Sequence, residues 1–199
     1  MNNIVSSVGQ FLADEQRLNE EESAVLFYGL EVAISLVSVV SALLLMGFLV
    51  GRVYDVVLFL VGFMPIRRTA GGYHASSVES CLVASCGICG IVLWVSQHTS
   101  VNGALFILVI SSLLVANLAP VEHPNNPQHP ARMKILRQRS RGLAAFYVCA
   151  IMFFSRIGYH GTTVLALSYA GAAASLAIAA YQKYVKLGAY AVNFEVDEM

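Results

Sequence analysis

Long apolar runs separated by short polar stretches are the feature that most constrains how this chain folds. Several of the runs approach the length of about 20 residues that an α-helix needs to cross about 30 Å of hydrocarbon. Because 57% of the residues are hydrophobic and 12% are charged, the chain is more apolar than a soluble core requires. The sequence therefore predicts an all-α, polytopic integral membrane protein with one domain, residues 1–199. About six helical segments are expected: Tyr28 to Val50, Val53 to Ile66, Cys81 to Val95, Val101 to Ala119, Leu143 to Phe154 and Thr162 to Tyr184.

The stretch before the first apolar run, residues 1–22, mixes apolar and charged side chains. Its apolar residues recur at nearly helical spacing, which predicts a short amphipathic helix at the membrane interface. A frayed polar lead-in is the alternative. The stretch lacks a basic start followed by an apolar run, so no cleavable secretory signal is predicted.

One polar stretch, Arg67 to Cys81, sets a histidine and a cysteine seven residues apart between two apolar runs. Along an unbroken helix, the distance from His74 to Cys81 would be about 10.5 Å, which is too long for a hydrogen bond between imidazole and thiol. The two side chains can meet only if a helix begins between them.

The sequence supplies such a helix start. Gly71 and Gly72 allow unusual backbone angles. The four residues from Ser76 to Glu79 have the form of a capping box, with Ser76 as the cap and Glu79 reaching back to it. Cys81 would then lie near the N-terminus of a helix, with His74 in a loop that can fold over it.

A cysteine in that position has its thiolate favoured by the helix amides and by a neighbouring imidazolium. Such a thiolate is a nucleophile for acyl transfer, and the histidine would give a proton to the leaving amine. Backbone amides at the helix start could stabilise the oxyanion. The spacing makes a cysteine peptidase one candidate, but a membrane protein with four cysteines and five histidines will contain some neighbouring pair of this kind by chance.

Two other functional classes, a membrane transporter or channel and a membrane scaffold, are alternatives to a peptidase. A small membrane transporter or channel, which would include a peptide exporter, could use Glu31 and Asp55 to line a polar path. A membrane scaffold would leave the histidine and cysteine unexplained. Cys86 and Cys89 have CxxC spacing, but within an apolar, glycine-flanked helix they are interpreted as packing residues, and neither they nor Cys149 suggest a disulfide framework.

Residues 120–141 are predicted to form a proline-rich and then basic cytoplasmic loop. A metal site formed by His74, His123 and His129 is conceivable, but no spacing typical of a metal site supports it. The basic run acts as a topology signal and could attract anionic lipid or an acidic peptide tail. A net charge of zero excludes a strongly basic nucleic-acid binder.

The distribution of lysine and arginine predicts the orientation of the chain. With six crossings and a cytoplasmic N-terminus, only Arg52 and Arg156 lie outside. The sequence thus predicts a multi-pass plasma-membrane protein with both termini and the 67–81 motif in the cytoplasm. The inner residues would be Arg17, Arg67, Arg68, Lys183, Lys186 and the five basic residues within 132–141.

The motif resembles the AgrB family, membrane cysteine peptidases of bacterial peptide quorum sensing. That family's pattern is a basic residue, then Gly-Gly-x-His-Ala, and a cysteine seven residues after the histidine. The similarity extends over nearly the whole chain, through the Tyr28–Glu31 helix start, Ala119-Pro120 and the basic cluster. The matching motif residues are Arg67, Gly71, Gly72, His74, Ala75 and Cys81.

The resemblance implies a defined activity. Such proteins remove the C-terminal part of an AgrD-type precursor peptide, hold the remainder as a thioester and release it as a cyclic thiolactone or lactone. By analogy Cys81 is the nucleophile and His74 its base, with no cofactor and no metal. Small-residue faces allow a homodimer without requiring one. Candidate supporting positions are Arg67, Arg68, Gly71, Gly72, Ser76, Glu79, Glu31 and Glu122.

Overall fold

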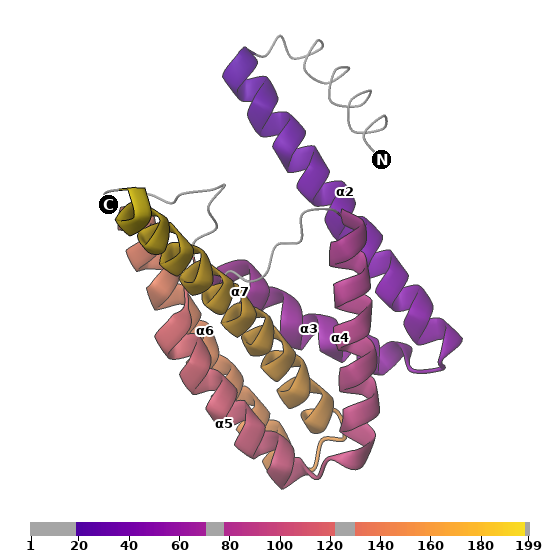
Figure 1. Ribbon diagram of the computed structural model, residues 1–199. Coiled ribbons are helices and arrows are strands. Elements are labelled where there is room, and N and C mark those ends of the chain that lie inside the picture. Colours follow the sequence, from indigo (N-terminus) through magenta and orange to yellow (C-terminus); the bar gives the residue numbers. More distant parts are fainter. Residues whose placement is uncertain (1–18, 71–77, 122–129, 198–199) are drawn as a thin grey trace.

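The computed structural model describes residues 19–70, 78–121 and 130–197, and every regular element within these ranges is an α-helix (Figure 1). Most of the predicted interfacial helix, residues 1–18, lies outside the described residues. The all-α prediction is confirmed. The helices are α2 (Glu20–Leu49), α3 (Val53–Ala70), α4 (Val78–His98), α5 (Val101–Leu118), α6 (Pro130–Arg156) and α7 (Thr162–Asp197).

Four stretches of the described helices are long and apolar enough to span a membrane. Large apolar side chains, such as Phe48, Phe106 and Phe153, are more than half exposed on the outer faces of the helices, where hydrocarbon would cover them. The chain is therefore a multi-pass membrane protein. The four spans are Val25–Leu49, Cys81–His98, Val101–Leu118 and Thr162–Gln182.

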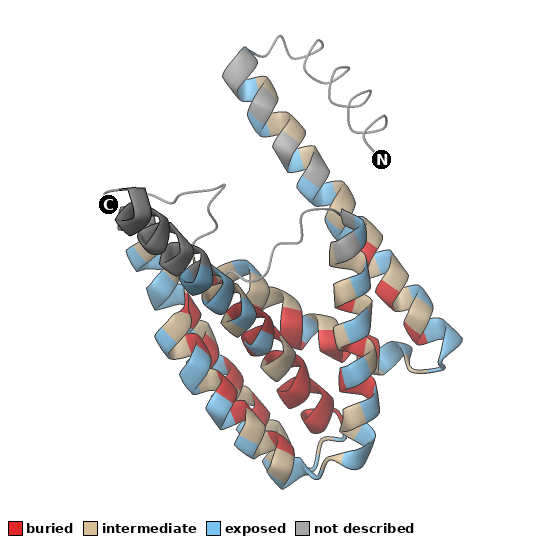
Figure 2. Ribbon diagram, in the orientation of Figure 1, coloured by how far each residue is buried: buried red, intermediate tan, exposed pale blue. Residues whose placement is uncertain are grey.

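The helix α7 is the centre of the bundle, since α3 and α5 both pack extensively against it. Small residues allow close approach: a Cβ added at Gly62 of α3 would lie 2.9 Å from the Cβ of Ser168 in α7. In Figure 2 the buried residues lie on the helix faces that point toward one another, and exposed residues cover the outside. The helix α2 packs along α3 and α4 at the edge.

The turns between helices gather at two opposite ends of the bundle. At one end, Arg52 between α2 and α3 bonds to the last turns of α4, and Tyr54 bonds to Tyr159 between α6 and α7. At the other end, Ala70 of α3 bonds to Val121, which follows α5. We call the end that contains Ala70 the motif end. The helices α3 and α6 therefore also run from one end of the bundle to the other, as the six-segment prediction requires.

Three helix boundaries predicted from hydropathy were wrong. The helix α2 begins at Glu20 rather than Tyr28, since Asn19 and Glu22 form a capping box. The helix α6 begins at Pro130 rather than Leu143, so the basic residues before Leu143 lie on a helix and not in a loop. The helix α7 continues beyond Tyr184 to Asp197.

The helix α3 was predicted to stop near Pro65, yet it continues through this residue to Ala70. Proline has no amide hydrogen, so the carbonyl of Val61 loses its helical partner. The Tyr147 hydroxyl of α6 donates a hydrogen bond to that carbonyl. A side chain 86 residues away thus supplies the donor that the proline removes.

Replacing Tyr147 with phenylalanine is expected to destabilise the folded protein by roughly 0.5–2 kcal/mol, because it leaves the Val61 carbonyl without this donor. The cost should shrink in a Pro65→Ala background, where the residue 65 amide can bond to Val61. Thermal unfolding in detergent measures the loss of stability in each of the two backgrounds. Tyr181→Phe, at an exposed position, is the matched control. Equal costs with and without Pro65 would contradict this explanation.

Candidate active site

The end of α3 is held by two other parts of the chain. The Ser140 hydroxyl, fully buried in α6, donates a hydrogen bond of 3.0 Å to the Thr69 carbonyl. The Val121 amide donates one of 3.1 Å to the Ala70 carbonyl. The last carbonyls of a helix lack partners within the helix. These two bonds therefore fix the point from which the chain enters the motif residues 71–77.

The side chain of Arg67 reaches from this last turn of α3 to α4. Its Nη2 donates a hydrogen bond to the Cys81 sulfur at 3.5 Å. The guanidinium carbon lies 5.6 Å from the centre of the Phe63 ring, one helical turn earlier. The structure thus places a positive charge, supported by an aromatic ring, beside the predicted nucleophile.

The position of Cys81 agrees with a helix start close before it. Cys81 follows Val78, the first described residue of α4, by three positions and is partly exposed. The amide dipoles of a first turn favour negative charge on a nearby sulfur. Glu79 is exposed in this turn, and Arg68 is exposed in the last turn of α3.

Several predicted site residues lie outside the described residues. They include the predicted base and the predicted cap, so the contact between His74 and Cys81 and the capping box at Ser76 stay predictions. The metal-site alternative also depends on such residues. These positions are Gly71, Gly72, His74, Ser76, Glu122, His123 and His129.

The other cysteines differ from Cys81 in their surroundings. Cys89 is buried in the core, Cys86 is partly buried one turn earlier, and Cys149 is exposed on α6. All four cysteines are free thiols. The burial of Cys89 agrees with a packing role for the CxxC pair, and Arg67 distinguishes Cys81 from the other three.

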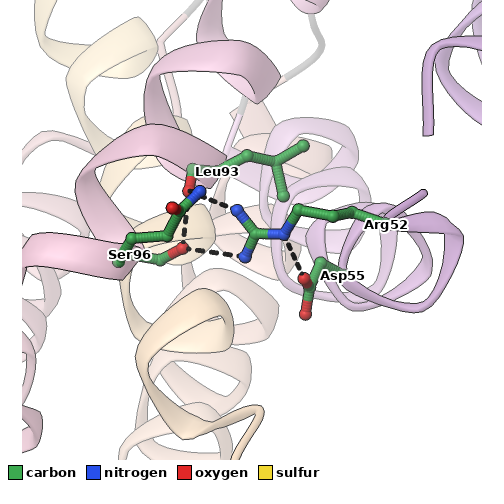
Figure 3. A network of polar contacts seen from close by, with 5 residues as sticks. Arg52, Asp55, Leu93 and Ser96 are labelled. Carbon is green, nitrogen blue, oxygen red and sulfur yellow. Dashed lines mark hydrogen bonds and ion pairs between the residues drawn. The ribbon is translucent and has the colours of Figure 1, made fainter. Parts of the chain in front are cut away.

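A polar cluster lies at the opposite end of the bundle (Figure 3). Arg52 Nε forms a 2.6 Å ion pair with Asp55 in the first turn of α3, and Arg52 Nη1 donates to the Leu93 carbonyl of α4 at 2.6 Å. Its Nη2 lies 3.4 Å from the Ser96 hydroxyl. Asp55, which was suggested to line a polar path, pairs in the structure with an arginine that also bonds to α4.

Glu31, the other acidic residue considered for such a path, lies well inside α2 because that helix starts earlier than predicted. Its side chain is outside what the structure describes. We call the end of the bundle that contains Arg52 the cluster end. There, Tyr54 and Tyr159 join α3 to the turn before α7. The hydrogen bond with Tyr54 raises the pKa of Tyr159, with smaller contributions from burial and nearby charge, so that phenol stays neutral.

The sequence did not predict three hydrogen bonds that side chains of α6 make to other helices. Ser140 and Tyr147 lie on a helix whose start was placed at Leu143. Arg141 of the same helix donates a hydrogen bond from Nε to the Ala116 carbonyl of α5. Only Pro65 gave a usable signal. A proline inside an apolar helix implies a carbonyl that needs a donor from elsewhere.

Comparison with protein-family models identifies the family of the chain. The family model for accessory gene regulator B, AgrB, matches residues 5–185, which includes all six described helices up to the late part of α7. Searches of curated proteins and of solved structures give no match. The match extends over most of the chain and includes the motif around Cys81, and the chain therefore belongs to the AgrB family of membrane cysteine endopeptidases, which process precursors of the AgrD kind.

Proposed function

We propose that this protein cleaves its precursor peptide through a thioester on Cys81. The Cys81 thiolate attacks the carbonyl of the scissile peptide bond, the C–S bond forms and the C–N bond breaks, and His74 gives a proton to the departing amine. An internal cysteine or serine of the peptide then attacks the thioester. That second step closes a thiolactone or lactone ring and returns the thiol.

The observation that carries the proposal is the contact between Arg67 and Cys81, 3.5 Å from nitrogen to sulfur. A charged donor at that distance stabilises a thiolate more than a thiol. Arg67 therefore acts as a positioning residue for the Cys81 sulfur before His74 takes part. Gly71, Gly72 and Ser76 would shape the segment that carries His74, and Arg68, Glu79, Glu31 and Glu122 remain candidates for contacts with the peptide.

The thioester can be captured directly. Purified protein is mixed with an AgrD-type precursor peptide, and the mixture is denatured with acid within seconds. In a Cys86→Ala, Cys89→Ala background, mass spectrometry should find the N-terminal part of the peptide on the tryptic fragment 69–132, in which Cys81 is then the one cysteine, and neutral hydroxylamine should release it. Two results would contradict the mechanism: cleavage of the peptide without any detectable adduct, or an adduct on Cys149.

The proposed orientation places both termini and the motif end in the cytoplasm. It is supported by charge, since Arg67, Arg68, Arg139 and Arg141 belong to the motif end and Arg52 to the opposite end. The proposed mechanism requires neither export of the product by this protein nor a homodimer.

A cysteine-labelling experiment tests the orientation. In a cysteine-free background, Ser100→Cys should react with an impermeant thiol reagent added to intact cells, and Gln138→Cys should react only after lysis. Both positions are exposed, whereas Ala70 at the motif end is fully buried and would be shielded in either orientation. The reverse pattern would place the motif end outside.

A further inference from the structure

An apolar groove runs between α4 and α7. Its volume is about 470 Å³, within the range of about 300–1,000 Å³ typical of small-ligand pockets. Among the described side chains that line it, none is charged. Residues that line it include Ala84, Ile88 and Val92 from α4 and Gly171, Ala174 and Ile178 from α7.

The groove lies on the same face of α4 as Cys81. Ala84 and Ile88 follow Cys81 by three and seven residues, the spacing at which residues share one helix face. The helix α7 runs in the opposite direction, from the cluster end toward the motif end. Ile178 and Gln182 therefore line the end of the groove that is nearest Cys81.

A continuous set of contacts joins the groove to the thiol. A Cβ added at Gly171 would lie 3.0 Å from Ile88 Cγ2 and 3.9 Å from the Phe63 ring, so all three meet at the groove wall. The Phe63 ring in turn supports the Arg67 guanidinium, which donates to the Cys81 sulfur. The wall and the reactive sulfur thus belong to one packed unit.

We infer that this groove holds the apolar side chains of the precursor peptide that immediately precede the scissile bond. The inference rests on the proposed function, because the thioester ties that part of the peptide to Cys81. An extended chain advances about 3.3–3.6 Å per residue, so about three residues reach the level of Ile88, about 10.5 Å along the helix from Cys81, and two reach about 7 Å along the groove wall. The groove would then select apolar residues at these positions and exclude charged ones.

Two alkylating peptides of matched reactivity test this inference. Acetyl-leucyl-leucyl chloromethyl ketone and acetyl-glycyl-glycyl chloromethyl ketone both transfer their peptide to the Cys81 sulfur as chloride leaves. Mass spectrometry of the Cys81 fragment gives both rates in the same detergent. In wild-type protein the leucyl reagent should react at least about tenfold faster, as expected when several apolar methylene groups are buried.

Ala174→Phe places a ring in the groove at an exposed position, and should lower the leucyl rate about tenfold while the glycyl rate stays unchanged. Comparison with wild type cancels the partition of each reagent into detergent. Val83→Phe is the matched control, because Val83 is 70% exposed two residues after Cys81, away from the groove face. It should keep the wild-type ratio of the two rates.

Ile178→Ala provides a second variant that truncates an exposed side chain and does not threaten folding. It should lower the ratio of leucyl to glycyl rates severalfold. An unchanged ratio in Ile178→Ala overturns the inference, whether or not Ala174→Phe folds, and would mean that lipid or detergent chains occupy the groove. Failure of both reagents to alkylate Cys81 in wild-type protein would instead contradict the proposed function, and the inference with it.

Discussion

Replacing Cys81 with alanine is expected to reduce cleavage of the precursor peptide by at least about a thousandfold, because it removes the nucleophile on which the acyl intermediate forms. His74→Ala should have a comparable effect. Effects of residues that act as one unit are not additive, so the double variant should be no worse than either single one. Immunoblots of membranes expressing protein and precursor measure cleavage.

The matched controls are the other cysteines. Cys149→Ala at an exposed site and Cys86→Ala at a partly buried one should each leave cleavage nearly unchanged. Each variant must be recovered from the membrane fraction in wild-type amount. Substantial cleavage by Cys81→Ala would remove the thioester mechanism, and loss of cleavage in Cys149→Ala alone would move the nucleophile to α6.

The second large effect is expected at Arg67. Hydrogen bonds to charged groups contribute about 1.5–3 kcal/mol, so Arg67→Met should slow alkylation of Cys81 by iodoacetamide near neutral pH by roughly 10-fold to 100-fold. Arg67→Lys keeps the charge without the guanidinium fork and should recover part of the rate. Cleavage should fall in parallel.

Arg68→Met is the control for this experiment, because Arg68 is the exposed neighbour in the same helical turn. Its alkylation rate should match that of wild type. If Arg67→Met and Arg68→Met behave alike, the contact with sulfur has no chemical role, and Arg67 only packs on Phe63.

Hydropathy predicted the helices well but their ends poorly. The apolar cores of α4 and α5 were located nearly in full, because burial in hydrocarbon depends on composition that the sequence displays. The start of α6 could not be found this way. Its first half carries basic side chains, and a helix with a polar surface has no hydropathy signal.

The site was predicted as far as the motif allowed. Residue spacing identified Cys81 and required a helix to begin close before it, and the contact with Arg67 gives that arginine a physical role. Contacts that connect distant parts of the chain could not be read from spacing. Pro65 appeared to end a helix because its compensating donor, Tyr147, lies on another helix. The pairing of Arg52 with Asp55 is local, but the bond from Arg52 to the Leu93 carbonyl depends on how α3 meets α4.

The anchoring of α3 by Ser140 and Val121 has a consequence for biosynthesis. A ribosome completes the helices that carry Arg67 and Cys81 well before it completes α6, which supplies Ser140. Until α6 inserts, the last turn of α3 lacks the Ser140 donor, and the Val121 donor is added only after α5. Peptidase activity should therefore arise late in synthesis, so that a nascent chain in the translocon does not attack the newly made peptides around it.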